Sequence, residues 1–142
     1  ALGCYKSNLI AAIGSVSGFM LQSTSSVSES ECTPSHSIPL IKLHGTTDYY
    51  DGEGVYNSVD SVLNFWVSFN NTNTDPIINN IDDNGTSITS YKYENGDNNV
   101  SVEHYKIIGG EHVWFNNDFN GKNTGQLIWD FVSKYDIDGL IE

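Results

Sequence analysis

The chain has 142 residues, of which 38% are hydrophobic and 12% aromatic, and this is enough for one domain around one buried core. Its basic residues are six lysines and no arginine, against 18 acidic residues, so the formal net charge is -12. That balance excludes a nucleic-acid partner, because binding phosphates needs a basic face. We expect no membrane partner either, because the chain has no apolar run of the roughly 18 residues that a membrane span needs.

The first half of the chain predicts two helices and two strands. Apolar side chains at near-helical spacing indicate the end of a helix over residues 2–11, and a short strand follows over 12–16. Beyond a polar, serine-rich loop, residues 38–44 are an apolar run opened by a proline and closed by a glycine, which is typical of a buried parallel strand. An acidic, glycine-bearing loop over 46–54 then leads to an amphipathic helix over 58–69.

The second half is less regular. Residues 70–99 are rich in asparagine and predict an irregular insertion, with a short hairpin strand over 88–93. Alternating apolar residues predict a strand over 100–108, and a single apolar stripe predicts a closing helix over 125–135. Because strands alternate with helices, we expect an α/β domain with a mostly parallel sheet flanked by helices.

Two of the predicted strands end in reactive side chains. The first is followed by Asp48 and the second by His112. In parallel α/β sheets, functional groups gather at the carboxyl ends of the strands, and the order acid then histidine matches the last two members of a Ser-Asp-His relay. Taken singly, Asp48 also suits a turn former and His112 an ordinary surface or core histidine, whereas His44 suits a structural histidine at a strand end.

Other side chains suggest a substrate pocket but no metal. Aromatic residues near the two loops are candidates to line an acyl or aryl pocket: Tyr49, Tyr50, Trp114 and Phe115. No histidine or cysteine spacing is typical of zinc. The acidic run over 80–85 imitates half of a calcium loop but lacks the closing glutamate, which favours a solvated turn, so we expect neither metal nor cofactor.

Two cysteines, Cys4 and Cys32, leave two interpretations open. In an oxidising compartment they can close a loop of about 28 residues, worth roughly 3 to 4 kcal/mol in the chain-entropy model. The alternative is two unrelated buried thiols.

Four segments carry a resemblance to a known family: residues 11–18, 39–48, 65–66 and 109–114. In this order they resemble the C-terminal half of secreted polyhydroxybutyrate depolymerase-type and feruloyl-esterase-type α/β hydrolases. The resemblance implies that residues 1–142 are a single partial α/β-hydrolase domain that starts after the nucleophile elbow. It also implies that Asp48 is the triad acid, that His112 is the triad base, and that the protein is secreted or periplasmic.

The resemblance places the nucleophilic serine upstream of residue 1. The run over 14–18 contains two serines, but its central residue is Val16 and it ends a strand instead of forming a strand-to-helix elbow. We therefore expect residues 1–142 alone to be inactive and the parent to be a serine esterase or depolymerase. Its substrates would be polyhydroxyalkanoate or feruloyl and acetyl polysaccharide esters.

Two partners and one alternative function follow. The strand at 12–16 would present an open edge, which we expect to pair with the missing N-terminal half or with a second copy. The alternative is a noncatalytic carbohydrate-binding or scaffold domain that keeps the hydrolase framework.

Overall fold

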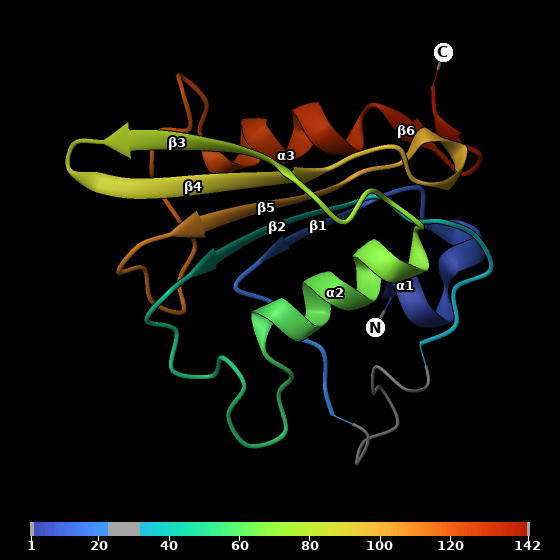
Figure 1. Cartoon of the computed structure of the whole chain (residues 1–142), viewed down its shortest axis with the longest axis horizontal. Helices are drawn as coiled ribbons and strands as arrows, with labels where there is room; N and C mark the ends of the chain where they lie inside the picture. Colours follow the sequence, from blue (N-terminus) through green and yellow to red (C-terminus); the bar gives the residue numbers. More distant parts are fainter. Residues whose placement is uncertain (1, 23–31, 142) are drawn as a thin grey trace.

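A five-stranded sheet in the order β1-β2-β5-β4-β3 organises the molecule (Figure 1). The computed structural model describes residues 2–22 and 32–141, so most of the predicted serine-rich loop lies outside the described residues. The elements are α1 (Leu2–Tyr5), η1 (Ser7–Leu9), β1 (Ile13–Val16), β2 (Leu40–Gly45), α2 (Val59–Phe69), β3 (Ile77–Asp83), β4 (Thr86–Tyr93), η3 (Asp97–Asn99), β5 (Val102–Ile107), α3 (Thr124–Val132), β6 (Tyr135–Asp136) and β7 (Gly139–Leu140).

The predicted fold class, a mostly parallel sheet flanked by helices as in an α/β hydrolase, is wrong. Strands β1, β2 and β5 are parallel, but β4 is antiparallel to both β5 and β3. No α-helix separates β3, β4 and β5, and the three α-helices of the described residues are short, with 4, 11 and 9 residues. The domain is therefore small and β-rich, with a mixed sheet.

The antiparallel part arises from residues 70–99, which were expected to be irregular apart from a short hairpin strand over 88–93; that strand is confirmed as part of β4. Asn84 and Gly85, with φ angles of 50° and 92°, form the tight turn between β3 and β4. Two consecutive residues at positive φ give the turn twist that suits a two-residue hairpin, and Asn-Gly is the favoured pair for it. The asparagine-rich composition thus marks a hairpin of seven- and eight-residue strands.

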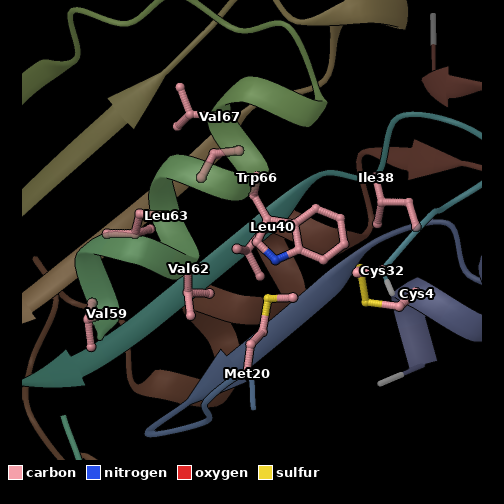
Figure 2. Close-up of a cluster of buried hydrophobic side chains, with 11 residues drawn as sticks. Cys4, Met20, Cys32, Ile38, Leu40, Val59, Val62, Leu63, Trp66 and Val67 are labelled. Atoms are coloured by element: carbon pink, nitrogen blue, oxygen red, sulfur yellow. A yellow bond between two sulfur atoms is a disulfide. The ribbon is translucent and has the colours of Figure 1, made fainter. Parts of the chain in front are cut away.

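Helix α2 covers one face of the sheet. The side chain of Ser58 caps its first turn by accepting a hydrogen bond from Ser61 N at 3.1 Å. Figure 2 shows Val62 and Trp66 of α2 directed toward Leu40 of β2 and Met20, with the disulfide at the edge of this cluster. Helix α3 packs against the opposite face, where its Leu127 and Phe131 meet apolar side chains of β2 and β5.

The two cysteines form a disulfide, which confirms one of the two interpretations left open by the sequence. The Cα atoms of Cys4 and Cys32 lie 4.6 Å apart, and the bond closes over a sequence separation of 28. It ties α1 to the segment that leads into β2. Within the described part of the chain, no helix has the length and apolar character needed to cross a membrane.

Candidate functional site

Asp48 follows β2 at the end of the sheet where the parallel strands finish. All six residues of β2 are buried, and the chain turns directly after Gly45. The carboxylate of Asp48 is fully buried, and its Oδ1 accepts a hydrogen bond from Tyr50 N at 3.1 Å, which fixes its orientation. A buried carboxylate needs such donors because it has lost its water.

The loop after β5 brings His112 to the same place. Gly45 and Gly110 touch so closely that a Cβ on Gly45 would lie 2.1 Å from the carbonyl oxygen of Gly110. Thr47 N donates to that same carbonyl oxygen at 2.9 Å, and Gly109 N donates to Thr46 Oγ1 at 2.8 Å. The loops after β2 and β5 are thus tied together by these two hydrogen bonds and by a close approach of Gly45 to Gly110 that only glycine permits.

These loops place the two predicted side chains in direct contact. His112 Nδ1 lies 2.9 Å from Asp48 Oδ2 in a hydrogen bond, although the two residues are 64 positions apart in the sequence. The His112 side chain is 48% exposed. Its other ring nitrogen, Nε2, has no hydrogen bond to any described residue, so it is free to exchange a proton with a bound group.

A second imidazole contacts the same carboxylate oxygen. His44 Nε2 lies 2.8 Å from Asp48 Oδ2, and the His44 side chain is only 1% exposed. The N–H direction does not point at the oxygen, so the contact is close without being an aligned hydrogen bond. Burial, followed by the nearby charge of Lys42, lowers the pKa of His44 to about 4, and this imidazole is therefore neutral at pH 7.

Aromatic rings surround His112. The Phe19 ring stacks on the imidazole with centroids 5.9 Å apart and an interplanar angle of 8°, while Tyr50 meets it edge-on at 5.2 Å. Of the predicted pocket residues, Tyr49 is 80% exposed and Trp114 is 58% exposed. Phe115, by contrast, is 3% exposed and packs in the core beneath α3, so the structure does not place it on that surface.

Three residues near this site were not foreseen as part of it. Phe19 follows β1 and contacts both His112 and His44. Lys42 is buried, donates from Nζ to the Gly18 carbonyl oxygen and lies 5.7 Å over the Phe19 ring, and burial lowers its pKa to about 8. Ser17 Oγ donates to the Val113 carbonyl oxygen at 2.9 Å, which links the end of β1 to the loop that carries His112.

The alternation of side chains along β2 is the sequence signal that could have identified Lys42 as a residue near this site. Leu40, Lys42 and His44 share one face of the strand, since alternate side chains point the same way. Leu40 packs under α2, so a lysine and a histidine on the same face had to be buried beside it. No comparable signal exists for Phe19 or Ser17, whose positions depend on loops.

Over residues 2–22 and 32–141, no three His, Cys, Asp or Glu side chains are grouped as a metal site requires. At the predicted solvated turn, Asp82 Oδ1 accepts a hydrogen bond from Gly85 N at 3.2 Å and closes the hairpin.

In comparisons with known proteins, no family model and no curated protein matches the chain.

Proposed function

We propose that Asp48 and His112 are the acid and base of a serine-type carboxylic ester hydrolase. The observation that carries the proposal is the 2.9 Å hydrogen bond from His112 Nδ1 to the buried Asp48 carboxylate. An aspartate on Nδ1 fixes the tautomer in which Nε2 is bare and accepts a proton. Paired groups of this kind, with a partly exposed imidazole, are typical of a general base beside a nucleophile.

The reaction follows from the pair. His112 Nε2 takes the proton of a serine hydroxyl while the serine oxygen bonds to the ester carbonyl carbon. The tetrahedral intermediate collapses, its alcohol leaves with the proton from Nε2, and an acyl-enzyme remains. Water then repeats the two steps, releases the acid and restores the serine. Asp48 stays ionised throughout and stabilises the imidazolium.

We place the nucleophilic serine on a segment outside residues 1–142, as the family resemblance implies. Strand β1 stands at the edge of the sheet, and a hollow of about 440 Å³ lies beside it, lined largely by apolar side chains such as Ile13, Phe19 and Trp66. A strand added parallel to β1 would end at the same edge of the sheet as β2 and β5, where Asp48 and His112 lie. A second copy of the chain is the other occupant, and the net charge of -12 disfavours it.

Polyhydroxyalkanoate oligomers and feruloyl or acetyl polysaccharide esters are the substrates we propose. They are neutral or weakly charged, which suits an acidic protein. The exposed rings of Tyr49, which follows Asp48 in the sequence, and of Trp114, two residues after His112, offer apolar contact area. Secretion or a periplasmic location is part of the proposal, and the disulfide supports it because disulfides persist in oxidising compartments.

The test is hydrolysis of p-nitrophenyl butyrate by residues 1–142 alone and by the polypeptide extended upstream as its gene encodes it. We expect activity only in the extended protein. His112→Ala in that protein should lower kcat by roughly 10³-fold or more. The matched control is His36→Ala, because His36 bonds to Ser7 and Ser37, outside this site.

Two results would contradict this proposal. An extended protein that hydrolyses no ester, or one whose rate is the same with His112→Ala, removes the catalytic role of the pair. Hydrolysis by residues 1–142 alone that is lost in His112→Ala would instead place the nucleophile inside the chain.

A noncatalytic carbohydrate-binding domain is the second candidate, and the exposure of Tyr49 and Trp114 favours it. Exposed aromatic rings bind sugar faces through apolar contact. Retention of the chain on insoluble polysaccharide, lost in Trp114→Ala and kept in His112→Ala, would support this function over ester hydrolysis.

A further inference from the structure

The chain contains three copies of the pattern Asn-x-Ser/Thr, in which the asparagine amide can accept an N-linked oligosaccharide. They begin at Asn70, Asn84 and Asn99. The pattern has this meaning only in a chain that enters a secretory compartment, and the disulfide between Cys4 and Cys32 supports such a route. The three copies differ in how the fold holds their side chains.

Asn70 belongs to the core. It follows α2 and is 0% exposed. Its Oδ1 accepts a hydrogen bond from Ile38 N at 2.8 Å, and its Nδ2 donates to Ile38 O at 2.7 Å. A sugar on Nδ2 would have no space there and would break a buried hydrogen bond. The first copy is therefore structural.

The copy at Asn99 is partly engaged in packing. Asn99 is exposed, but it lines a cavity of about 270 Å³ together with Tyr135 and Leu140. The third residue of this copy, Ser101, is buried, and its hydroxyl shares a hydrogen bond of 2.9 Å with the Tyr135 hydroxyl. The folded protein thus already uses the hydroxyl that the pattern supplies.

Asn84 lies at the tip of the β3–β4 hairpin, where the whole pattern is accessible. Asn84 and Gly85 are exposed, and Thr86 is half-buried, with no hydrogen bond from its hydroxyl to any described residue. Figure 1 shows this turn projecting from the end of the sheet, past helices α2 and α3. A bulky hydrophilic group attached there would extend into solvent and displace nothing from the core.

The contacts of the turn are compatible with a sugar on Asn84. Its Nδ2 donates to Asp83 Oδ1 at 3.0 Å. Because Nδ2 carries two hydrogens, a glycosylated amide keeps one N–H for this bond. Asp83 is held from its other oxygen, since Oδ2 accepts hydrogen bonds from Asn117 Nδ2 at 2.9 Å and from Asp118 N at 3.1 Å. The acceptor therefore projects from a turn that is anchored to the rest of the domain.

We propose that Asn84 is the acceptor of an N-linked oligosaccharide. Its Nδ2 attacks the anomeric carbon of a lipid-linked oligosaccharide diphosphate held by an oligosaccharyltransferase. A nitrogen–carbon bond forms, the bond from that carbon to the diphosphate oxygen breaks, and the amide proton goes to a base of the transferase. The proposal rests on the secretory route that is part of the proposed function, and it is independent of ester hydrolysis.

The test is to express residues 1–142 behind a secretion signal in a eukaryotic host cell, which supplies the transferase and the lipid-linked oligosaccharide. Mass spectrometry of intact glycopeptides, from cells and from medium, reports each asparagine whether or not the chain is released. Intact glycopeptides are needed because Asn-Gly pairs also deamidate spontaneously to the aspartate that enzymatic removal of a glycan leaves. We expect a glycan on Asn84, and a bare Asn70 in the released protein.

Variants of the third residue show whether the pattern itself is read. Thr86→Ala leaves the Asn-Gly turn in place and should lower the glycan occupancy of Asn84 roughly tenfold or more, whereas Thr86→Ser keeps a hydroxyl and should retain the glycan. Asn120 and Gly121 are a control within the chain, because they form a turn with φ angles of 57° and 85° but precede Lys122. Asn120 should be bare, and Lys122→Thr should make it an acceptor.

A bare Asn84 in a host that glycosylates its own secreted proteins would overturn the proposal. So would an occupancy that is the same in Thr86→Ala, or a released protein with a glycan on Asn70 and none on Asn84. If Asn84 carries the glycan while the extended protein hydrolyses no ester, the proposed ester hydrolysis fails and the acceptor role of Asn84 stands.

Discussion

His104 should make the protein sensitive to mild acid, and His104→Phe should remove part of that sensitivity. The imidazole is buried on β5 and stacks on Tyr91, with ring centroids 5.8 Å apart. Burial, followed by the charge of Lys42, lowers the pKa of His104 from 6.5 to about 3. At a pH between these two values, the imidazole binds a proton in the unfolded chain but not in the folded protein. The free energy of unfolding therefore falls as the pH is lowered through this range.

The magnitude follows from the two pKa values. With 6.5 in the unfolded chain and about 3 in the folded protein, His104 alone lowers the free energy of unfolding by roughly 2.5 kcal/mol between pH 7 and pH 4.5. The result depends little on the folded value, because a folded pKa anywhere up to 4 leaves the ring mostly neutral at pH 4.5.

Urea unfolding followed by tryptophan fluorescence measures this at pH 7 and pH 4.5. We expect the free energy of unfolding of His104→Phe to fall by roughly 2.5 kcal/mol less than that of the unmutated protein between pH 7 and pH 4.5. His104→Gln is the matched control, since it also cannot titrate but packs differently, and it should show the same reduced slope. If the free energy of unfolding depends on pH as steeply in both variants as in the unmutated protein, the reasoning is refuted, whatever the stability of the variants at pH 7.

Three further predictions concern the disulfide, Lys42 and Gly45. Replacing Cys4 and Cys32 by serine should lower the free energy of unfolding by about 3.5 kcal/mol, and the Tm by about 10 °C in calorimetry, for a separation of 28. Because the folded pKa of Lys42 is lowered from 10.5 to about 8, stability from this group rises as the pH increases between those values. Lys42→Met should remove a gain of roughly 2 kcal/mol between pH 7.5 and pH 9.5 in denaturant titrations. Gly45→Ala should destabilise the protein by more than roughly 3 kcal/mol and separate the loops that hold Asp48 and His112, because its Cβ would meet the Gly110 backbone. A Tm within 2–3 °C of the unmutated value, which corresponds to roughly 1 kcal/mol, would contradict this.

The contact between Asp48 and His112 was predictable because it depends on a simple rule. Each residue follows a buried strand, and the structure pairs those two strands, β2 and β5, in parallel. Their carboxyl ends therefore meet at one edge, and the loops need only be short. The prediction required neither the full strand order nor the number of strands.

The hairpin strand predicted over 88–93 is confirmed as part of β4, but its partner β3 was missed because the composition of that segment concealed its periodicity. Asparagines dominate the segment, and most of β3 is exposed, so apolar alternation is weak there. The turn at Asn84-Gly85 was the usable signal, since this pair favours a two-residue hairpin. Had it been given more weight, residues 77–93 would have indicated two antiparallel strands, and the sheet would have been expected to be mixed.

His44 shows the limit of reasoning from single residues. Its position at the end of β2 was predicted, and so was a structural role. What the sequence did not specify is the shared oxygen of Asp48, because that contact depends on how the turn after Gly45 folds back. Turn geometry is set by a few φ angles that one sequence leaves open.

The covalent ring from Cys4 to Cys32 encloses β1 entirely. A force applied to the two ends of the polypeptide would pass through the sulfur atoms and bypass that strand. Full extension in a single-molecule pulling experiment would then fall short by roughly 100 Å, since the 28-residue separation spans about 3.6 Å per residue. Adding a reducing agent should release this hidden length in one step.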